Sequence, residues 1–257
     1  MEGIAKTNRR DFLKLGLAAG GGLVLGFQWS TSLGATVADG SAWEEVAFNS
    51  YLSISPDDFK LLKSKNIDLF IHAAANSDFR STPAIKRVLK EVNLNGTMRI
   101  LNLVKQLDVS EFVYTSSAYC AGHINGDIQP DYINTTGVFR NPYEESKLEA
   151  ELYLSSFAKI NGLKYRIFRL TGIGGRLMEP PLGSVSKYDI FYGWGIFFLK
   201  AKLKALLSLD NIYSSSVEMP IRIAANLDGN MNVVPVDYAA KIILRFAYQT
   251  IKTPTII

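Results

Sequence analysis

The chain has 257 residues, of which 47% are hydrophobic and 20% charged, enough to bury one sizeable core, so we expect one globular domain. The formal net charge is +4, but residues 1–14 hold four basic and two acidic side chains, so the remainder is close to neutral and does not indicate nucleic-acid binding. The single cysteine, Cys120, excludes an internal disulfide, and two histidines, His72 and His123, are too few for a cluster with metal-ligand spacing.

The first 38 residues have the pattern of an export signal. Residues 8–14 read Asn-Arg-Arg-Asp-Phe-Leu-Lys, residues 15–27 are uncharged, and small residues cluster between positions 34 and 38. The apolar run is too short to span a bilayer comfortably, which is typical of a cleaved signal. The paired arginines followed by Phe-Leu-Lys resemble the twin-arginine motif, with Asn8 where serine or threonine is commoner. We therefore expect residues 1–38 to be a signal peptide that directs the chain through the twin-arginine translocase to the periplasm, with a cytoplasmic location as the alternative.

Residues 39–57 form an orphan segment between this leader and the fold. Leader and segment together resemble the start of molybdopterin-binding subunits of exported aldehyde- and isoquinoline-type oxidoreductases, and nothing after them does. The join is expected between Pro56 and Phe59, which leaves residues 58–257 for the folded domain. The glycines between positions 16 and 26 do not indicate a phosphate-binding loop, because their spacing does not fit one and no predicted strand precedes them.

After the join, predicted strands and helices alternate. Strands are expected at residues 67–73, 111–117, 164–169 and 232–235, and helices at residues 83–107, 142–160 and 237–250. This alternation is typical of a parallel sheet covered by helices. It breaks at about residues 176–230, where we expect a small substrate-cap region. The predicted fold class is therefore α/β, a Rossmann-like parallel sheet with covering helices that lacks the first βαβ unit.

Tyr143 and Lys147 predict a proton-transfer device. On a helix they lie one turn apart on the same face, so the ammonium can sit beneath the phenol and favour its ionised form. A tyrosine, with an ordinary pKa of about 10, needs such help to act as an acid or base. Asn141 is a suitable N-cap for this helix, and Pro142 suits its first turn. Ser117 ends the preceding strand, at the edge where open α/β sheets bind ligands.

Residues 190–209 are rich in Phe and Leu, with Lys200, Lys202 and Lys204 expected on one side. We interpret this segment as a half-buried cap helix with a lysine face. Two alternatives stay open, which are peripheral contact with a membrane and the lining of an acyl tunnel.

Four blocks of sequence occur in a fixed order around the proton-transfer pair. They are residues 67–75 (Ile-Asp-Leu-Phe-Ile-His-Ala-Ala-Ala), 92–97 (Val-Asn-Leu-Asn-Gly-Thr), 141–151 (Asn-x-Tyr-x-x-Ser-Lys-x-x-x-Glu) and 232–238 (Asn-Val-Val-Pro-Val-Asp-Tyr). A solvated helix face would explain an isolated Tyr-x-x-x-Lys pair, but it does not explain these blocks. From residue 58 to about residue 250 the chain resembles the extended short-chain dehydrogenase/reductase family. The closest resemblance is to its thioester-reductase and fatty acyl-CoA reductase branch.

This resemblance implies roles for four catalytic residues. Tyr143 is expected to be the general acid/base, and Lys147 is expected to lower its pKa and to hold the nicotinamide ribose. Ser117 is expected to polarise the substrate carbonyl. Asn93 matches the asparagine that completes a water-linked proton relay from the lysine.

The same resemblance implies an NADP or NAD site. Ala73, Ala74 and Ala75 are expected to form the wall beside the cofactor. Leu170 and Thr171 belong to the loop that flanks the nicotinamide, although Leu170 replaces the usual proline. A family member would open with a strand, a glycine-rich turn, a helix and a second strand. The sequence shows none of these, so we expect weak cofactor binding.

These features predict an NAD(P)H-dependent reductase that acts on a small acyl thioester or related carbonyl substrate. A nucleotide-sugar epimerase or dehydratase is an alternative, because it uses the same device. The Pro-Val-Asp-Tyr block and the hydrophobic cap favour the reductase. A recombined or truncated exported protein without catalysis is the other alternative, because the glycine-rich loop is missing.

Overall fold

The computed structural model describes residues 23–25, 56–185, 191–206, 213–218, 231–247, 249 and 255–256. The chain divides into two compact units. The first contains Met1–Thr171 and Ile243–Ile257, and the second contains Gly172–Ile242. Every catalytic residue predicted from the sequence lies in the first unit.

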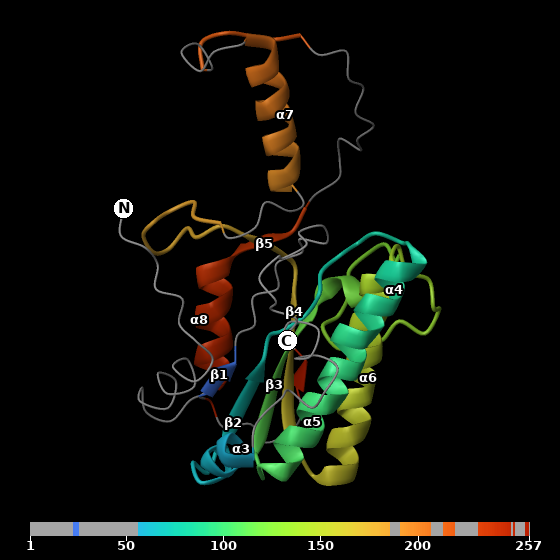
Figure 1. Cartoon of the computed structure of the whole chain (residues 1–257). Helices are drawn as coiled ribbons and strands as arrows, with labels where there is room; N and C mark the ends of the chain where they lie inside the picture. Colours follow the sequence, from blue (N-terminus) through green and yellow to red (C-terminus); the bar gives the residue numbers. More distant parts are fainter. Residues whose placement is uncertain are drawn as a thin grey trace. The chain divides into compact units, whose positions relative to one another are not determined.

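A parallel sheet forms the centre of the first unit (Figure 1). Its strands, in the spatial order β1-β2-β3-β4-β7, are β1 (Leu23–Leu25), β2 (Leu69–His72), β3 (Glu111–Ser117), β4 (Lys164–Leu170) and β7 (Thr255–Ile256). All neighbouring pairs run parallel. The strands predicted at 67–73, 111–117 and 164–169 are confirmed, and so is the parallel α/β fold class.

The first strand, β1, differs from what we expected of the leader. Residues 23–25 pair in parallel with residues 70–72 of β2, whereas the sequence places them in the apolar run of the signal peptide. An exposed sheet edge presents unpaired N–H and C=O groups, and it is a template for a short apolar segment in extended form. The rest of the predicted leader, its glycines and most of the 39–57 segment lie outside the described residues. The signal peptide therefore stays a prediction.

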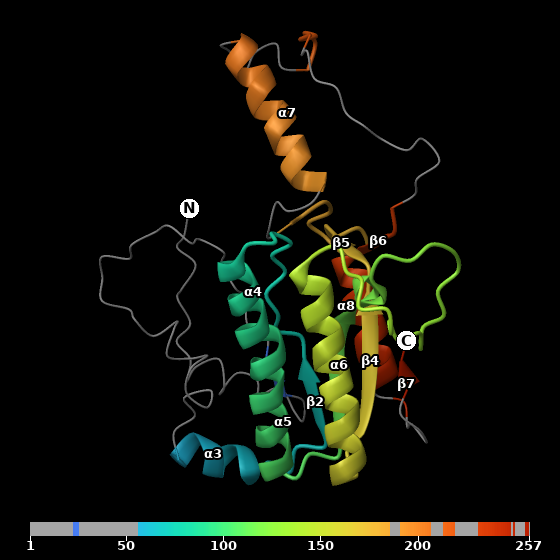
Figure 2. The same cartoon turned by 90° about the vertical axis from the view of Figure 1, so that its right-hand side faces the viewer.

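Helices α4 (Pro83–Leu89), α5 (Gly96–Gln106) and α6 (Pro142–Asn161) cover one face of this sheet (Figures 1 and 2). The π-helical turn η2 (Lys90–Asn95) joins α4 to α5, α3 (Pro56–Lys63) precedes β2, and the short 3₁₀ turn η3 (Ala118–Ala121) follows β3. The helix predicted at 83–107 is thus present, but a π turn interrupts it. Such turns often occur at functional sites. This one carries Asn93.

Helix α6 has the ends that its sequence predicts. The side chain of Asn141 accepts a hydrogen bond from the backbone N–H of Glu144 at 3.1 Å, and Pro142 occupies the first turn. Gly162 ends the helix with a φ of +67°, the left-handed conformation that glycine adopts without steric cost. These local signals fix where Tyr143 and Lys147 lie on the helix.

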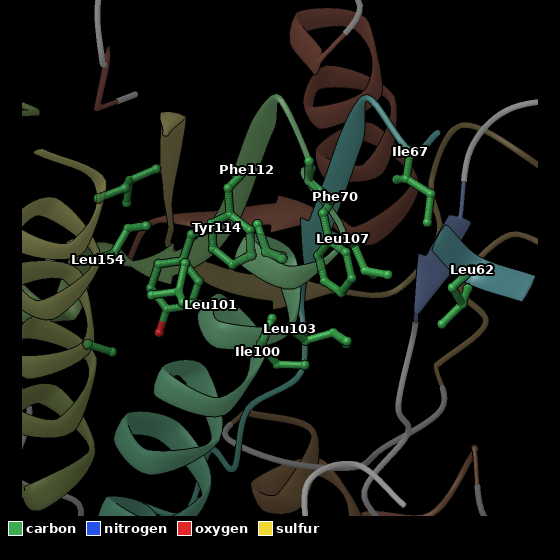
Figure 3. Close-up of a cluster of buried hydrophobic side chains, with 14 residues drawn as sticks. Leu62, Ile67, Phe70, Ile100, Leu101, Leu103, Leu107, Phe112, Tyr114 and Leu154 are labelled. Atoms are coloured by element: carbon green, nitrogen blue, oxygen red, sulfur yellow. The ribbon is translucent and has the colours of Figure 1, made fainter. Parts of the chain in front are cut away.

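The core of the first unit lies between the sheet, α5 and α6 (Figure 3). At its centre Phe70 and Phe112 stack with their ring centroids 5.8 Å apart. The other buried members are Leu62, Ile67, Ile100, Leu101, Leu103, Val104, Leu107, Val109, Tyr114, Ala150, Leu154 and Ile167. Of these side chains, only Tyr114 carries a hydroxyl group. On the other face of the sheet, the ring of Phe246 packs against Phe168 of β4 at 6.3 Å between centroids.

The second unit contains its own two-stranded parallel sheet, made of β5 (Gly172–Gly174) and β6 (Val233–Pro235). The strand predicted at 232–235 therefore pairs with β5, and the expectation that it continues the main sheet is wrong. Its three residues carry no local signal that selects one partner strand over another. Helix α8 (Val236–Ala247) follows directly, where we predicted a helix at 237–250.

Asp237 gives the Pro-Val-Asp-Tyr block a structural role in the second unit. Its carboxylate accepts hydrogen bonds from the backbone N–H groups of Leu177, Met178 and Glu179 at 3.3, 2.7 and 2.9 Å. Three successive amide donors on one carboxylate hold the chain after β5 against the start of α8.

Helix α7 (Phe191–Leu206) lies within the segment predicted at 190–209. At about 100° per residue, Lys200 and Lys204 share one side of the helix and Lys202 lies on the other. The expectation of a single lysine face is therefore wrong, because alternate residues project in opposite directions from a helix. Trp194 and Phe197 remain 60% and 48% exposed. None of the helices in the described ranges is both long enough and apolar enough to cross a membrane.

Candidate functional site

Three neighbouring strands of the first unit bring the predicted site residues to one edge of the sheet. The register pairs His72 of β2 with Tyr114 of β3, and Ser117 of β3 with Leu170 of β4. Parallel strands end at the same edge, so Ala73, which follows β2, lies near the ends of β3 and β4. Within the first unit, the residues predicted on these strand ends are therefore neighbours.

Tyr143 lies in the first turn of α6 and is half-buried. Its ring contacts that of Phe79, from the loop after β2, at 5.1 Å between centroids. Burial raises the pKa of Tyr143 to about 12, although a hydrogen bond with the side chain of Ser117 acts in the opposite direction. Ser117 is 4% exposed, and its hydroxyl also accepts from the backbone N–H of Tyr119 at 3.3 Å. A protonated phenol thus lies beside a fixed hydroxyl group.

Lys147 is 1% exposed and points toward β3. Its Nζ donates to the hydroxyl of Tyr114 and to the carbonyl oxygen of Thr115, both at 2.8 Å, and lies 4.3 Å from the centroid of the Tyr114 ring. Burial lowers the pKa of Lys147 to about 8, although the carboxylate of Glu151 acts in the opposite direction.

The expected effect of Lys147 on Tyr143 is not what the structure shows. The pKa of Tyr143 is raised rather than lowered, because burial outweighs its hydrogen bond with Ser117. The ammonium of Lys147 is occupied by two oxygen atoms of β3 instead. In this arrangement Tyr143 is a proton donor at neutral pH.

Asn93 is 1% exposed and joins the loop after β2 to α6. Its Oδ1 accepts from the backbone N–H of Asn76 at 2.8 Å, and its Nδ2 donates to the carbonyl of Asn76 at 3.0 Å and to Ser146 Oγ at 2.9 Å. Ser146 Oγ in turn donates to the carbonyl of Tyr143 at 2.8 Å. The side chain of Asn93 therefore holds the turn that carries Tyr143, and its part in a proton relay stays a prediction.

The residues expected around the nicotinamide have small or partly exposed side chains. Ala73 is exposed, Ala74 is buried, and Ala75, Leu170 and Thr171 are half-buried. The three alanines follow β2, Leu170 is the last residue of β4, and Thr171 follows it.

The ammonium of Lys147 also fits a cofactor. It has three N–H donors, and its two bonds to β3 use two of them. The third has no partner among the described side chains and carbonyls, which suits a ribose hydroxyl. The residues that precede β2 in the chain, where a phosphate loop would be sought, are mostly outside the described ranges.

A buried group of polar side chains behind Lys147 was missed by the sequence analysis. Thr97 Oγ1 donates to the carbonyl of Asn93 at 2.6 Å and lies 3.1 Å from His72 Nε2, and the hydroxyl of Tyr114 accepts from Lys147. Burial, reinforced by the charge of Lys147, lowers the pKa of His72 to about 3. Tyr114 was hidden in an apolar strand. The available signal was that a buried tyrosine hydroxyl needs a hydrogen-bond partner.

A second missed cluster contains Glu151, Arg169 and Cys120. Arg169 pairs with Glu151 at 2.6 Å, with both side chains buried, and Cys120 Sγ donates to Glu151 Oε1 at 3.4 Å. Burial raises the pKa of the Cys120 thiol to about 12, so this thiol is a poor nucleophile. Within the described residues, no three His, Cys, Asp or Glu side chains are grouped as metal ligands.

Comparison with known proteins shows which family the sequence matches. Residues 48–243 match the model of an NAD-binding domain family described as male sterility protein. A Methanocaldococcus jannaschii protein assigned as a UDP-glucose 4-epimerase is 27% identical over 131 residues, which are 49% of this chain and 41% of that protein.

Two solved structures share the fold. The terminal R domain from the myxalamid PKS-NRPS biosynthetic pathway has a TM-score of 0.58 and 19% identity, covering 81% of this chain and 47% of that one. MoeE5 in complex with UDP-glucose and NAD has a TM-score of 0.56 and 19% identity, covering 76% and 58%. The chain spans about half the length of these relatives.

The family match covers most of the chain and includes every predicted site residue. It begins at residue 48, inside the segment that we assigned to residues 39–57. The chain therefore belongs to the male sterility protein family of NAD-binding domains.

Proposed function

We propose that this chain is a nicotinamide-dependent reductase of an acyl thioester or a related carbonyl compound. The observation that carries the proposal is the protonated phenol of Tyr143 beside the buried hydroxyl of Ser117, at the carboxyl edge of the sheet. Membership of an NAD-binding family supports the cofactor class. The Pro-Val-Asp-Tyr block supports the thioester branch over other branches.

Each residue of the site has a separate role in this reaction. Bound NAD(P)H supplies a hydride to the carbonyl carbon. Ser117 donates a hydrogen bond to the carbonyl oxygen, and Tyr143 transfers its phenolic proton to that oxygen as negative charge develops there. With a thioester, the resulting hemithioacetal breaks its C–S bond and releases an aldehyde and a thiol. Lys147 binds the nicotinamide ribose through its remaining N–H.

Cofactor binding is expected to be weak in this proposal. A dinucleotide carries two phosphates, which the family binds with backbone N–H groups at a helix N-terminus after a glycine-rich turn. The sequence shows no such turn. The loss of several charge-assisted hydrogen bonds, at about 1.5–3 kcal/mol each, weakens binding by orders of magnitude.

The test is an assay of the full chain at high nicotinamide concentration. Acyl-CoA thioesters are added to the chain with NADPH or NADH, and both cofactor oxidation and aldehyde formation are followed. We expect thioester-dependent turnover that falls about 10²–10⁴-fold in Tyr143→Phe. Turnover that is unchanged in this variant would remove the proposal.

A nucleotide-sugar epimerase or dehydratase is the second candidate. The M. jannaschii relative and the MoeE5 structure with UDP-glucose favour it. Incubation of the chain with UDP-glucose and NAD, followed by separation of the sugar products, distinguishes it from the reductase. An absence of Tyr143-dependent turnover in both assays would favour the third candidate, a recombined or truncated protein without catalysis.

We also propose that residues 1–38 direct export through the twin-arginine translocase to the periplasm. The supporting observation is the sequence of residues 8–14 followed by an uncharged run. A reporter fused to this leader tests it, since replacement of Arg9 and Arg10 by lysine should abolish export. Peripheral membrane contact through α7 remains a weaker proposal, because its lysines do not share one face.

A further inference from the structure

The ammonium of Lys147 is hydrogen-bonded to a buried hydroxyl group of the first unit. From α6, Lys147 Nζ donates to the hydroxyl of Tyr114 on β3 at 2.8 Å. Both residues are 1% exposed, so water does not compete for this bond.

The capacity of each group fixes the direction of this bond. An ammonium group has N–H donors and no acceptor, so the Tyr114 oxygen accepts from Lys147 through a lone pair. The hydroxyl of Thr97 uses its one proton on the carbonyl of Asn93, so it accepts from His72, which carries its proton on Nε2.

We propose that Tyr114 is a positioning residue for Lys147. The Tyr114 oxygen on β3 accepts directly from the ammonium. It holds the ammonium in one place and stabilises its charged form where no solvent reaches it.

Other charged and titratable groups around Lys147 do not replace this acceptor. Glu151 favours the ammonium from α6, and Cys120 from η3 acts in the same direction when ionised. His72, on β2, is neutral, because burial and Lys147 itself lower its pKa to about 3. Tyr143 is also protonated. Tyr114 and the carbonyl of Thr115 are the two described atoms that hydrogen-bond directly to the ammonium.

The experiment titrates Lys147 itself by NMR in the full chain carrying isotope-labelled lysine, with the signal assigned by its loss in Lys147→Met. Tyr114→Phe keeps the ring that packs in the core and removes only the acceptor oxygen. We expect it to lower the protonation constant of Lys147 at least about tenfold, since hydrogen bonds to charged groups are the strong ones.

Tyr165→Phe is the matched control. Tyr165 lies on the neighbouring strand β4 and hydrogen-bonds to Ser155 at 2.9 Å, away from Lys147. A Lys147 titration that is the same in Tyr114→Phe as in the wild type, or that moves equally in Tyr165→Phe, overturns the proposal. The measurement needs neither cofactor nor substrate, so its outcome is independent of the proposed reaction.

Discussion

The layer between the sheet and helices α5 and α6 has an apolar half and a polar half, built on the same strands. Phe70 and His72 lie two residues apart on one face of β2, as Phe112 and Tyr114 do on β3. The first member of each pair packs in the core, and the second makes a buried hydrogen bond, His72 with Thr97 and Tyr114 with Lys147. All these side chains are at most 5% exposed. The same degree of burial therefore stabilises the fold in the apolar half, whereas in the polar half it shifts the pKa values of the side chains.

The largest effect is expected in the polar half, where stability should depend on pH in the acid range. His72 has a pKa of about 3 in the folded chain and 6.5 in the unfolded chain. Below pH 6.5 His72 binds a proton in the unfolded chain but not in the folded chain. The free energy of unfolding therefore decreases as the pH falls from 6.5 toward 3. The full loss is at most about 5 kcal/mol. His72→Gln, which keeps an N–H donor for Thr97, should flatten this part of the stability profile in urea unfolding.

His123→Gln is the control for this measurement, because His123 is exposed. Its profile should follow that of the wild type. A wild-type profile with no loss of stability below pH 6.5 would show that His72 is not a buried neutral group.

The apolar half is tested by Phe112→Ala, which removes a ring with 0% exposure from the centre of the core. We expect a loss of about 3–5 kcal/mol in the free energy of unfolding, independent of pH between 5 and 8. Ile160→Ala on α6 is the control, because Ile160 is 82% exposed and should change stability by less than about 0.5 kcal/mol. Similar losses in both variants would mean that the apolar half is not a packed core.

Lys147→Met should have a smaller effect of the opposite sign. The folded pKa of about 8 lies below the ordinary value of 10.5, so the wild type gains stability as the pH rises from 8 to 10.5, where only the unfolded chain keeps the proton. Below pH 8 the buried charge costs about 3 kcal/mol. We expect the variant to be more stable by about 1–4 kcal/mol at pH 7 and to lack the alkaline rise. Lys159→Met, at an exposed position of α6, should show neither change.

The sequence predicted the elements whose ends have local chemical signals. Asn141, Pro142 and Gly162 define α6 within one residue, and alternating strands and helices gave the parallel sheet. Tyr143, Lys147 and Ser117 were found because their spacing on a helix and at a strand end is itself the signal.

The sequence did not predict features that depend on contacts between distant segments. The π turn at Lys90–Asn95 interrupts a run with no helix breaker, and it is associated with the bonds between Asn93 and Asn76. Tyr114 and Thr97 lie in segments that fit an apolar strand and an ordinary helix. Their polar contacts, Tyr114 with Lys147 of α6 and Thr97 with His72 of β2, appear only when these distant segments come together.

Arg169 fixes the middle of the long loop that connects η3 to α6. Residues 122–141 contain no helix or strand, and such loops are uncommon above about 12–15 residues. The guanidinium of Arg169 is anchored on Glu151 and donates to the carbonyls of Pro130 and Tyr132 at 2.9 and 2.5 Å. This tether divides one long loop into two short ones, each with its own closure entropy. An insertion or deletion before Pro130 therefore changes only the first of these loops. The second loop, which leads to the turn that carries Tyr143, still begins at the same anchored position.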